Sequence, residues 1–316
     1  MTGNIEKPRV SAVILHLDDT ASLLECLASL RQVNYPAFDI TVVHNGLPDA
    51  ELEKNLSPFS GMLSGVMHTG GNLGFSLGNN LGIKRALEKG ADYVLLLNDD
   101  IVVNPDFLDI IVEEAEKNPM TGMIGPEVLH FSDRARISFR GAKLDRESGS
   151  FFFPHADEIS SPELTVEPVE SDYVNGCALL VRKSLIDHIG LLDERFFIYW
   201  EESDWGLRAK RAGFRCLVVP RAKIWHKVSV TTGGNNSPFK IYHKTRSHLF
   251  FAGRHCPGLT GRLIYEDLRD CAWLIYKSGQ RGRIRKAAAY LAGIAGYLAG
   301  SSGVGPAWLR DVRRNV

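Results

Sequence analysis

The chain has 316 residues, 44% of them hydrophobic and 23% charged, a composition that is typical of globular proteins and excludes a disordered chain. Its 37 basic and 37 acidic residues cancel, so the overall charge gives no reason to expect a nucleic-acid partner. The length suits one large domain, or one domain with an appendage.

Apolar runs alternate with helical patterns in the first 120 residues. The apolar runs predict strands at 10–15, 40–43, 65–67 and 93–97. The helical patterns predict helices at 23–30, at 75–89 and from Pro105 to about residue 117. This alternation is typical of a largely parallel sheet covered by helices on both faces, so we expect an α/β fold.

The pattern changes in the second half of the chain. Further strands are predicted at 123–129, 137–144, 173–181 and 214–219, with a polar, proline-containing loop at 160–168. Short helices are predicted at 184–189 and 204–212, and a more basic helical part begins near residue 241. We therefore expect two domains, an α/β domain over residues 1–250 and a helical, basic region over residues 251–316.

Candidate ligand-binding residues follow the expected parallel strands directly. They are His16–Asp19, His44–Gly46, Gly70–Asn72 and Asn98–Asp100. Open parallel sheets bind ligands beyond the carboxyl ends of their strands, so these four segments are expected to meet at one site.

The segment Thr69–Asn80 is rich in glycine and asparagine. Glycines let backbone N–H groups approach the oxygens of a phosphate or sugar, and asparagine amides both donate and accept hydrogen bonds. A tight turn before a closely packed helix would also use Gly74 and Gly78, and this alternative stays open. The spacing matches neither G-x-G-x-x-G nor Walker A, which disfavours a dinucleotide site.

The sequence Asn98-Asp99-Asp100 ends a continuous apolar strand. A hard divalent cation needs carboxylate oxygens, and a diphosphate would supply its remaining ligands. Asp100 is the first choice as metal ligand, with Asp99 or Asn98 binding a sugar or ribose. Alone the pair of aspartates is also typical of a helix cap.

The run Trp200-Glu201-Glu202-Ser203-Asp204 places three carboxylates within four positions. A carboxylate beside two others should have a raised pKa, which makes Glu202 a candidate general base toward a sugar hydroxyl. The alternative is that these acids stabilise the first turn of a helix. Arg208 is placed to pair with Asp204. On sequence alone, His226 is more readily a structural histidine than a ligand.

The C-terminal part differs in charge from the rest of the chain. Residues 261–316 carry a net charge of +6 and the first 260 residues −6, so a basic tail follows an acidic body. Apolar residues at helical spacing from Tyr290 to Leu298 follow the cluster Arg281, Arg283, Arg285 and Lys286. They fit an interfacial membrane helix or a helix packed on its own domain equally well. The stretch Ala287–Leu309 is too rich in glycine and serine for a transmembrane helix.

The five cysteines are odd in number and far apart, so they predict reduced, buried thiols in a cytoplasmic protein rather than disulfides or a metal cluster. The polar segment Met1–Arg9 lacks the apolar core of a signal peptide.

Several of these motifs together resemble the family-2 inverting glycosyltransferases of the GT-A fold, most closely the branch of bacterial rhamnosyltransferases and galactofuranosyltransferases. The matching segments are 10–15, 42–46, 71–80, 95–100, 197–213 and 225–229. The resemblance covers about residues 10 to 230, so it implies that the expected α/β domain is a GT-A domain.

The resemblance also implies roles for individual residues. Glu202 takes the place of the catalytic base, which is usually aspartate, and Asp100 with His226 takes the place of the ligands of Mg²⁺ or Mn²⁺. Residues expected to bind the donor are His16, His44, Asn45, Gly71, Asn72, Gly74, Asn79, Asn98 and Asp99. Residues expected to bind the acceptor are Trp200, Glu201 and Asp204. Two positions depart from the pattern: His44 replaces an acidic residue after the second strand, and Leu17-Asp18-Asp19 replaces an aromatic-Asn pair after the first.

The resemblance implies single-displacement transfer of a sugar from a nucleotide diphosphate to a hydroxyl of a cell-surface glycan on a lipid carrier. The first candidate donor is dTDP-rhamnose and the second is UDP-galactofuranose. Such an enzyme would be cytoplasmic, either free or peripheral on the inner face of the cell membrane, where its basic C-terminus would meet an anionic surface. The alternative from another class is a catalytically silent glycan-binding protein on the same scaffold.

Overall fold

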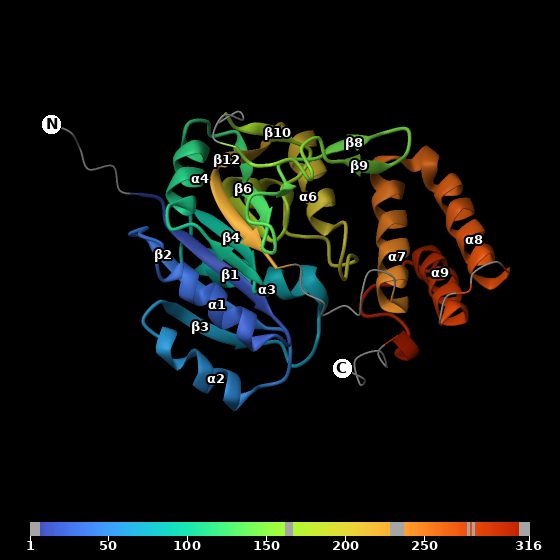
Figure 1. Ribbon diagram of the computed structural model, residues 1–316, viewed down its shortest axis with the longest axis horizontal. Coiled ribbons are helices and arrows are strands. Elements are labelled where there is room, and N and C mark those ends of the chain that lie inside the picture. The colour runs from blue at the N-terminus through green and yellow to red at the C-terminus, as the bar shows by residue number, and fades with distance from the viewer. Residues whose placement is uncertain (1–6, 162–166, 228–236, 277–278, 280–281, 310–316) are drawn as a thin grey trace.

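Four parallel strands lie side by side in the first half of the chain, in the spatial order β3-β2-β1-β4 (Figure 1). The computed structural model describes residues 7–161, 167–227, 237–276, 279 and 282–309. The strands are β1 (Val10–His16), β2 (Phe38–His44), β3 (Leu63–His68) and β4 (Tyr93–Asn98). The helices between them are α1 (Thr20–Leu30), α2 (Ala50–Leu56) and α3 (Gly74–Glu88), with a 3₁₀ turn η1 (Ser57–Phe59). All four carboxyl ends therefore lie along one edge of the sheet, as the sequence predicts.

The second half of the chain extends the same sheet. Its full order is β10-β12-β6-β11-β4-β1-β2-β3, and β11 runs antiparallel between β4 and β6. The added strands are β5 (Ile101–Val103), β6 (Thr121–His130), β7 (Ile137–Phe139), β10 (Val169–Ser171), β11 (Ala178–Arg182) and β12 (Arg215–His226). A separate hairpin is formed by β8 (Lys143–Asp145) and β9 (Ser150–Phe152). The added helices are α4 (Phe107–Glu116), α5 (Lys183–Ile189) and α6 (Glu201–Arg211).

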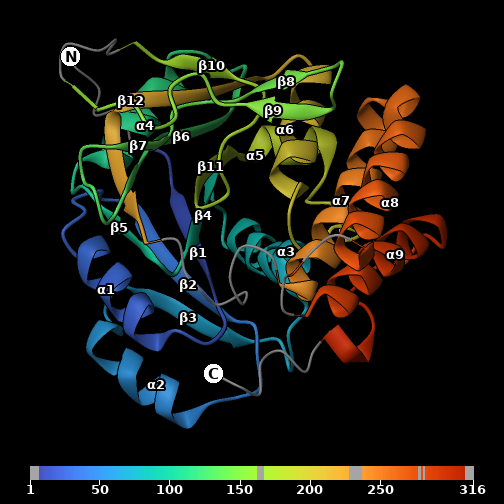
Figure 2. The same cartoon turned by 45° about the vertical axis from the view of Figure 1, so that its right-hand side comes forward.

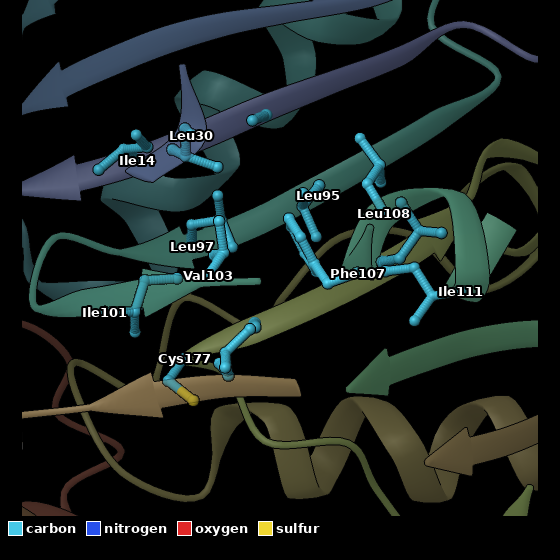
Figure 3. Close-up of a cluster of buried hydrophobic side chains, with 14 of the residues drawn as sticks. Ile14, Leu30, Leu95, Leu97, Ile101, Val103, Phe107, Leu108, Ile111 and Cys177 are labelled. Carbon is cyan, nitrogen blue, oxygen red and sulfur yellow. The ribbon is translucent and has the colours of Figure 1, made fainter. Parts of the chain in front are cut away.

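Strand β4 shows why its sequence is apolar without interruption. Leu95 and Leu97 pack on one face of the sheet with residues of α1 and α4, such as Leu30 and Phe107 (Figure 3). Its alternate residues, including Leu96, pack on the other face with residues of α3 and α5. A strand buried on both faces has no solvent side, and each such side chain stabilises the fold by about 1.5–3 kcal/mol. The expected α/β sheet with helices on both faces is confirmed.

The C-terminal helices form a separate layer beside α6 (Figures 1 and 2). They are α7 (Pro238–His255), α8 (Thr260–Tyr276) and α9 (Arg283–Leu298), with a 3₁₀ turn η2 (Pro257–Leu259) after α7. Ser237 caps α7 and Pro238 occupies its first turn. The boundary expected after residue 250 falls inside α7, which packs against both α8 and α9. Within the described ranges, no helix is long and apolar enough to cross a bilayer.

Three predicted strands are wrong in extent. The strand expected at 214–219 continues to His226 as β12. The strand expected at 137–144 is two strands, β7 and β8, because Gly141 between them adopts a φ of +107°. The strand expected at 173–181 is restricted to β11, because residues 173–177 turn before it. Four short elements, α2, β5, β9 and β10, were not predicted, since three to seven residues give little periodicity. Part of the loop expected at 160–168 lies outside the described residues, as does Arg281 of the basic cluster.

Candidate active site

Three histidines end strands β1, β2 and β3. His16, His44 and His68 are register partners across the three strands. The Nδ1 atoms of His44 and His68 lie 3.0 Å apart, and the ring centroids of His16 and His44 are 5.6 Å apart. Burial and the two neighbouring histidines lower the pKa of His44, which favours its neutral form. A neutral ring offers one donor and one acceptor where the resemblance leads us to expect a carboxylate.

The two aspartates after β4 contact different histidines. Oδ2 of Asp99 lies 2.7 Å from Nδ1 of His16, and Oδ1 of Asp100 lies 3.1 Å from Nε2 of His226. His226 ends β12, which pairs with β5 directly after Asp100. The sheet therefore brings Asp100 and His226 together from distant parts of the sequence. Asn98, at the end of β4, donates its backbone N–H to the carbonyl of Cys177.

Asp100 and His226 fit two ligands of one divalent cation. Two adjacent ligands of an octahedral ion with bonds of about 2.1 Å are about 3 Å apart, which matches the observed 3.1 Å. Among the described residues no group of three or more potential ligands from His, Cys, Asp and Glu is gathered. The residues therefore fit a cation that completes its coordination with a diphosphate and water, not one held by the protein alone.

Asn45 determines the shape of the glycine-rich loop. Its Nδ2 donates to the carbonyl of Gly74 at 3.1 Å, and its Oδ1 accepts from the backbone N–H of Leu73 at 2.9 Å. Asn45 is buried, as is Asn79, whose Nδ2 donates to a backbone carbonyl within α3. The structure thus gives these two asparagines contacts inside the protein, whereas Gly71 and Asn72 are partly exposed in the loop.

Gly74 joins this loop to the segment before α6. The backbone N–H of Phe75 donates to the carbonyl of Phe197 at 2.6 Å. Gly74 has a φ of +85°, and a Cβ atom on it would lie 2.4 Å from that carbonyl oxygen. Glycine is therefore required here for both conformation and space.

A strained turn begins helix α6. Tyr199 and Trp200 both adopt left-handed conformations, with φ of 71° and 74°, which non-glycine residues adopt rarely and mostly where function requires it. The helix starts three residues earlier than the sequence predicts, at Glu201. In the first turn, the backbone N–H groups of Gly176, Glu202 and Ser203 favour the ionised form of the Glu202 carboxylate and lower its pKa.

Glu201 and Glu202 are both carboxylates with raised pKa values. Burial raises the pKa of Glu202 despite its backbone hydrogen bonds, and burial with the charge of Glu202 raises the pKa of Glu201 further. The direction is as predicted for Glu202, but burial is the main cause rather than the neighbouring acids. Within the described part of the chain, Oε2 of each residue is buried without a hydrogen-bond partner. Such atoms are costly and are typical of ligand sites.

Asp204, which we expected to bind the acceptor, is fully buried and is held by three basic side chains. Its carboxylate accepts from Arg208 at 2.9 Å, from Arg254 at 2.6 Å and pairs with His255 at 2.9 Å. Burial alone would raise the pKa of Asp204, but His255 and the two arginines outweigh it and lower the pKa. The residue joins α6 to α7, a role in holding the helix that carries Glu202.

Glu202 lines a cavity of about 520 Å³ that also takes residues from the C-terminal helices. One wall includes Tyr173, Trp200 and Ser203, and the other is formed by residues of α7, α8 and α9. The charges of Asp100 and Glu202 both raise the pKa of the Cys177 thiol, so the candidate metal ligand Asp100 and the candidate base lie around the same residue.

Several residues of this site were missed in the sequence. His68 could have been predicted, because it ends its strand in the same way that His16 and His44 end theirs. The cavity residues Lys244 and His248 also carried a signal, since with Lys240 they recur every four residues along a helix. Phe197 begins one of the segments that carry the family resemblance, but its contact with Gly74 could not be read from the sequence. Asp267 carried no signal, because its position depends on tertiary packing.

Comparisons with known proteins agree on one family. The description "Glycosyl transferase family 2" matches residues 11–189. A protein of Mycobacterium tuberculosis (strain H37Rv) named N-acetylglucosaminyl-diphospho-decaprenol L-rhamnosyltransferase is 26% identical over 245 residues, covering 72% of this chain and 79% of that protein. The galactofuranosyltransferase GlfT2 of the same strain is 25% identical, over 63% of this chain and 33% of its own length. The solved structure of GalNAc-T7 with UDP, GalNAc and Mn²⁺ has a TM-score of 0.64 at 14% identity, over 90% of this chain and 54% of that one.

Proposed function

The chain belongs to glycosyl transferase family 2, and from that premise we propose that it is an inverting, divalent-cation-dependent glycosyltransferase with Glu202 as its general base. The observation that carries the proposal is the position of Glu202. Its pKa is raised by burial, its Oε2 has no partner among the described residues, and it lines a cavity large enough for a sugar.

Glu202 would take the proton of an acceptor hydroxyl as the hydroxyl oxygen attacks the anomeric carbon of the donor. A glycosidic C–O bond forms, and the C–O bond to the nucleotide diphosphate breaks on the opposite face. The electron pair leaves with the diphosphate and the proton stays on Glu202. A raised pKa suits this step, because a base with a higher pKa accepts the proton more readily.

Asp100 and His226 would hold Mg²⁺ or Mn²⁺, which when bound would stabilise the negative charge that develops on the departing diphosphate. Gly71, Asn72 and Gly74 would let the backbone of the loop approach the donor. His16, Asp99 and Asn98 lie at the strand ends near this pair and would contact its sugar or ribose. Neutral His44 would lie toward the nucleobase.

We propose rhamnose, transferred from dTDP-rhamnose, as the donor sugar, because the Mycobacterium tuberculosis relative is named a rhamnosyltransferase. UDP-galactofuranose is the second candidate, from the relative named galactofuranosyltransferase. The acceptor would be a glycan on a lipid carrier, by analogy with the diphospho-decaprenol in the first relative's name.

A thermal-shift screen tests the donor site. Protein with Mn²⁺ is heated with dTDP, UDP, GDP or CDP, alongside Asp100→Ala and His188→Ala, the latter an exposed histidine on α5. A nucleotide at about 100 times its dissociation constant adds roughly 2.7 kcal/mol of stability. We expect Mn²⁺-dependent stabilisation by dTDP, lost in Asp100→Ala and kept in His188→Ala. No response to any nucleotide would favour the alternative, a catalytically silent glycan-binding protein. Measured turnover with a nucleotide sugar would exclude that alternative.

We also propose that the enzyme works at the inner, cytoplasmic face of the cell membrane. Exposed apolar residues gather on the outer sides of α8 and α9. They are Tyr265, Leu268, Trp273, Tyr276, Ile284, Leu291 and Leu298. Arg283 and Arg285 lie beside them, so this outer face of α8 and α9 combines apolar contact with attraction to anionic lipid. All five cysteines are free and buried, in keeping with a reducing compartment.

A further inference from the structure

Six of the fourteen residues that line the cavity at Glu202 come from α7, α8 and α9, which, like Glu202 itself, lie outside the stretch that matches the family. The matched stretch ends at residue 189. Lys244 and His248 enter the cavity from α7, Asp267 from α8 and Tyr290 from α9. The α/β domain therefore supplies the base, and the C-terminal layer supplies much of what a second substrate would touch.

One side of the cavity is an aromatic surface. The Trp200 ring is stacked on His248 with centroids 4.2 Å apart and planes 6° apart. His248 is fixed by a hydrogen bond of 3.1 Å from its Nε2 to the carbonyl of Gly149. Phe151 lies beside Trp200, with centroids 6.0 Å apart. Flat, polarisable rings held by their neighbours suit the C–H face of a sugar ring.

Positive charge enters the same cavity from α7, where Lys244 lies one helical turn before His248. Neither Lys244 nor Lys240, one turn earlier on α7, forms a salt bridge with any carboxylate in the described ranges, and Lys244 contacts the ring of Tyr199 at 5.5 Å. Burial and the charge of Lys244 lower the pKa of Lys240, which shows that the two ammonium groups destabilise each other. An anion between them would relieve that repulsion.

Asp267 is a second acid in the cavity besides Glu202. Burial, followed by Asp270 and Glu266, raises the pKa of Asp267 to about 7, although Thr245 lowers it in part. A carboxyl group with this raised pKa is partly protonated at neutral pH, so it cancels the lysine charge only in part. It can still donate to or accept from a sugar hydroxyl.

We infer that this cavity is the acceptor site and that it selects a sugar diphosphate ester. The sugar would stack on Trp200 with its hydroxyl at Glu202, and Lys244, backed by Lys240, would pair with the diphosphate oxygens. The inference rests on the proposed function and deepens it, because it assigns the acceptor class and the residues that select it. Lysine is a suitable point charge for a diphosphate whose position along a flexible linkage varies.

Binding calorimetry with three probes tests the inference. The probes are N-acetylglucosamine joined by a diphosphate to farnesol, the same sugar as a methyl diphosphate ester, and the same sugar as an uncharged farnesyl glycoside. The buffer contains EDTA, so that no divalent cation draws a diphosphate to Asp100 and His226. The proteins are the wild type, Lys244→Gln, Lys244→Arg and the control Lys84→Gln, which removes an exposed lysine on α3.

We expect both diphosphate probes to bind at least about tenfold more tightly than the uncharged glycoside, since charged hydrogen bonds are the stronger ones. Lys244→Gln should abolish this preference, and Lys244→Arg and Lys84→Gln should keep it. Tighter binding of the farnesyl than of the methyl diphosphate would point to a lipid-linked acceptor, and equal binding to recognition of the diphosphate alone.

Equal binding of all three probes, a preference that survives Lys244→Gln, or no binding of any probe would overturn the inference. The thermal-shift screen with nucleotides distinguishes failure of the acceptor assignment from failure of the proposed function. Normal Mn²⁺-dependent nucleotide stabilisation in a protein without diphosphate preference would refute the acceptor assignment alone. Loss of nucleotide stabilisation in the wild type would refute the proposed function.

Discussion

A Cβ atom on Gly74 would lie 2.4 Å from the carbonyl oxygen of Phe197, so the glycine-rich loop and the segment before α6 meet backbone to backbone. The expected donor-binding loop and the helix that carries Glu202 therefore cannot move independently without breaking this contact.

Gly74→Ala should reduce kcat/KM by at least about tenfold, because the new methyl group forces the loop away from Phe197. Gly90→Ala is the matched control: Gly90 has a similar φ of +81° but nothing within 4 Å of the added Cβ. Both variants should lose about 1 kcal/mol or more of stability through strain in the backbone. Steady-state kinetics and urea unfolding check this, and equal activity in the two variants would contradict it.

Glu202→Gln should lower kcat by about 10²- to 10⁴-fold, the usual contribution of a general base. In the wild type, kcat should rise with pH as Glu202 loses its proton, with a midpoint above the ordinary value of 4.5, because burial raises its pKa. The measurement is a pH–rate profile, with Glu113→Gln, an exposed residue of α4, as control. A profile with the same acidic limb in Glu202→Gln would assign the base to another residue.

Glu201→Gln should stabilise the protein at neutral pH by about 1–3 kcal/mol, the order of cost of an unpaired buried polar group. The pKa of Glu201 is raised on folding, so its stability contribution is full below the ordinary pKa of 4.5 and is lost as pH rises through the folded value. The gain in the variant should therefore be larger at pH 8 than at pH 4. Urea unfolding at the two pH values measures it; a gain that is independent of pH would show that ionisation is not the cause.

Asp204→Asn should destabilise the protein by about 3–5 kcal/mol, since it leaves Arg254 and Arg208 without their buried partner. The pKa of Asp204 is lowered on folding, so its contribution is present above the ordinary 3.8 and is lost as pH falls through the folded value. Asp187→Asn is the control, because Asp187 pairs with Lys183 at the surface and should change stability by less than about 1 kcal/mol. Similar losses in both variants would contradict the assigned role.

Trp273→Ser combined with Tyr276→Ser should weaken binding to vesicles that contain anionic lipid, because both side chains lie on the exposed outer face of α8. Met120→Ser removes an exposed apolar side chain away from the C-terminal layer and serves as control. Vesicle co-sedimentation at low and high salt is the measurement. Unchanged partitioning of the double variant would refute the membrane proposal. Deleting α8 and α9 would be a poorer test, since it would also uncover the buried residues Ile241 and Leu249 of α7.

The sequence predicts the sheet and the strand-end residues well, because both depend on short-range pattern. β4 is an unbroken apolar run, and His16, His44 and Asp100 each follow such a run at the carboxyl edge. The pair of Asp100 and His226 became predictable once the resemblance placed two distant motifs in one site. The two side chains lie close together because β5 pairs with β12. That pairing could not be predicted, because β5 has only three residues.

The role of Asp204, the burial of Glu202 and the cavity could not be predicted, because they depend on how the helices pack against one another. Asp204 has the same local pattern as Glu202, yet Arg254 and His255 on α7 turn it into a structural residue. The raised pKa of Glu202 was expected from neighbouring charge, whereas burial causes it, and burial follows from packing. Six of the residues that line the cavity come from α7, α8 and α9, and no sequence motif indicates how these helices pack.

The contacts of Asp204 also imply an order of assembly. The sheet is complete in sequence at β12, but Arg254 and His255, which fix the helix bearing Glu202, are made later on the ribosome. A nascent chain would thus hold all strands of the sheet before the helix that bears Glu202 is anchored. If Glu202 is the base, as proposed, the transferase would become active only after the end of α7 has been synthesised.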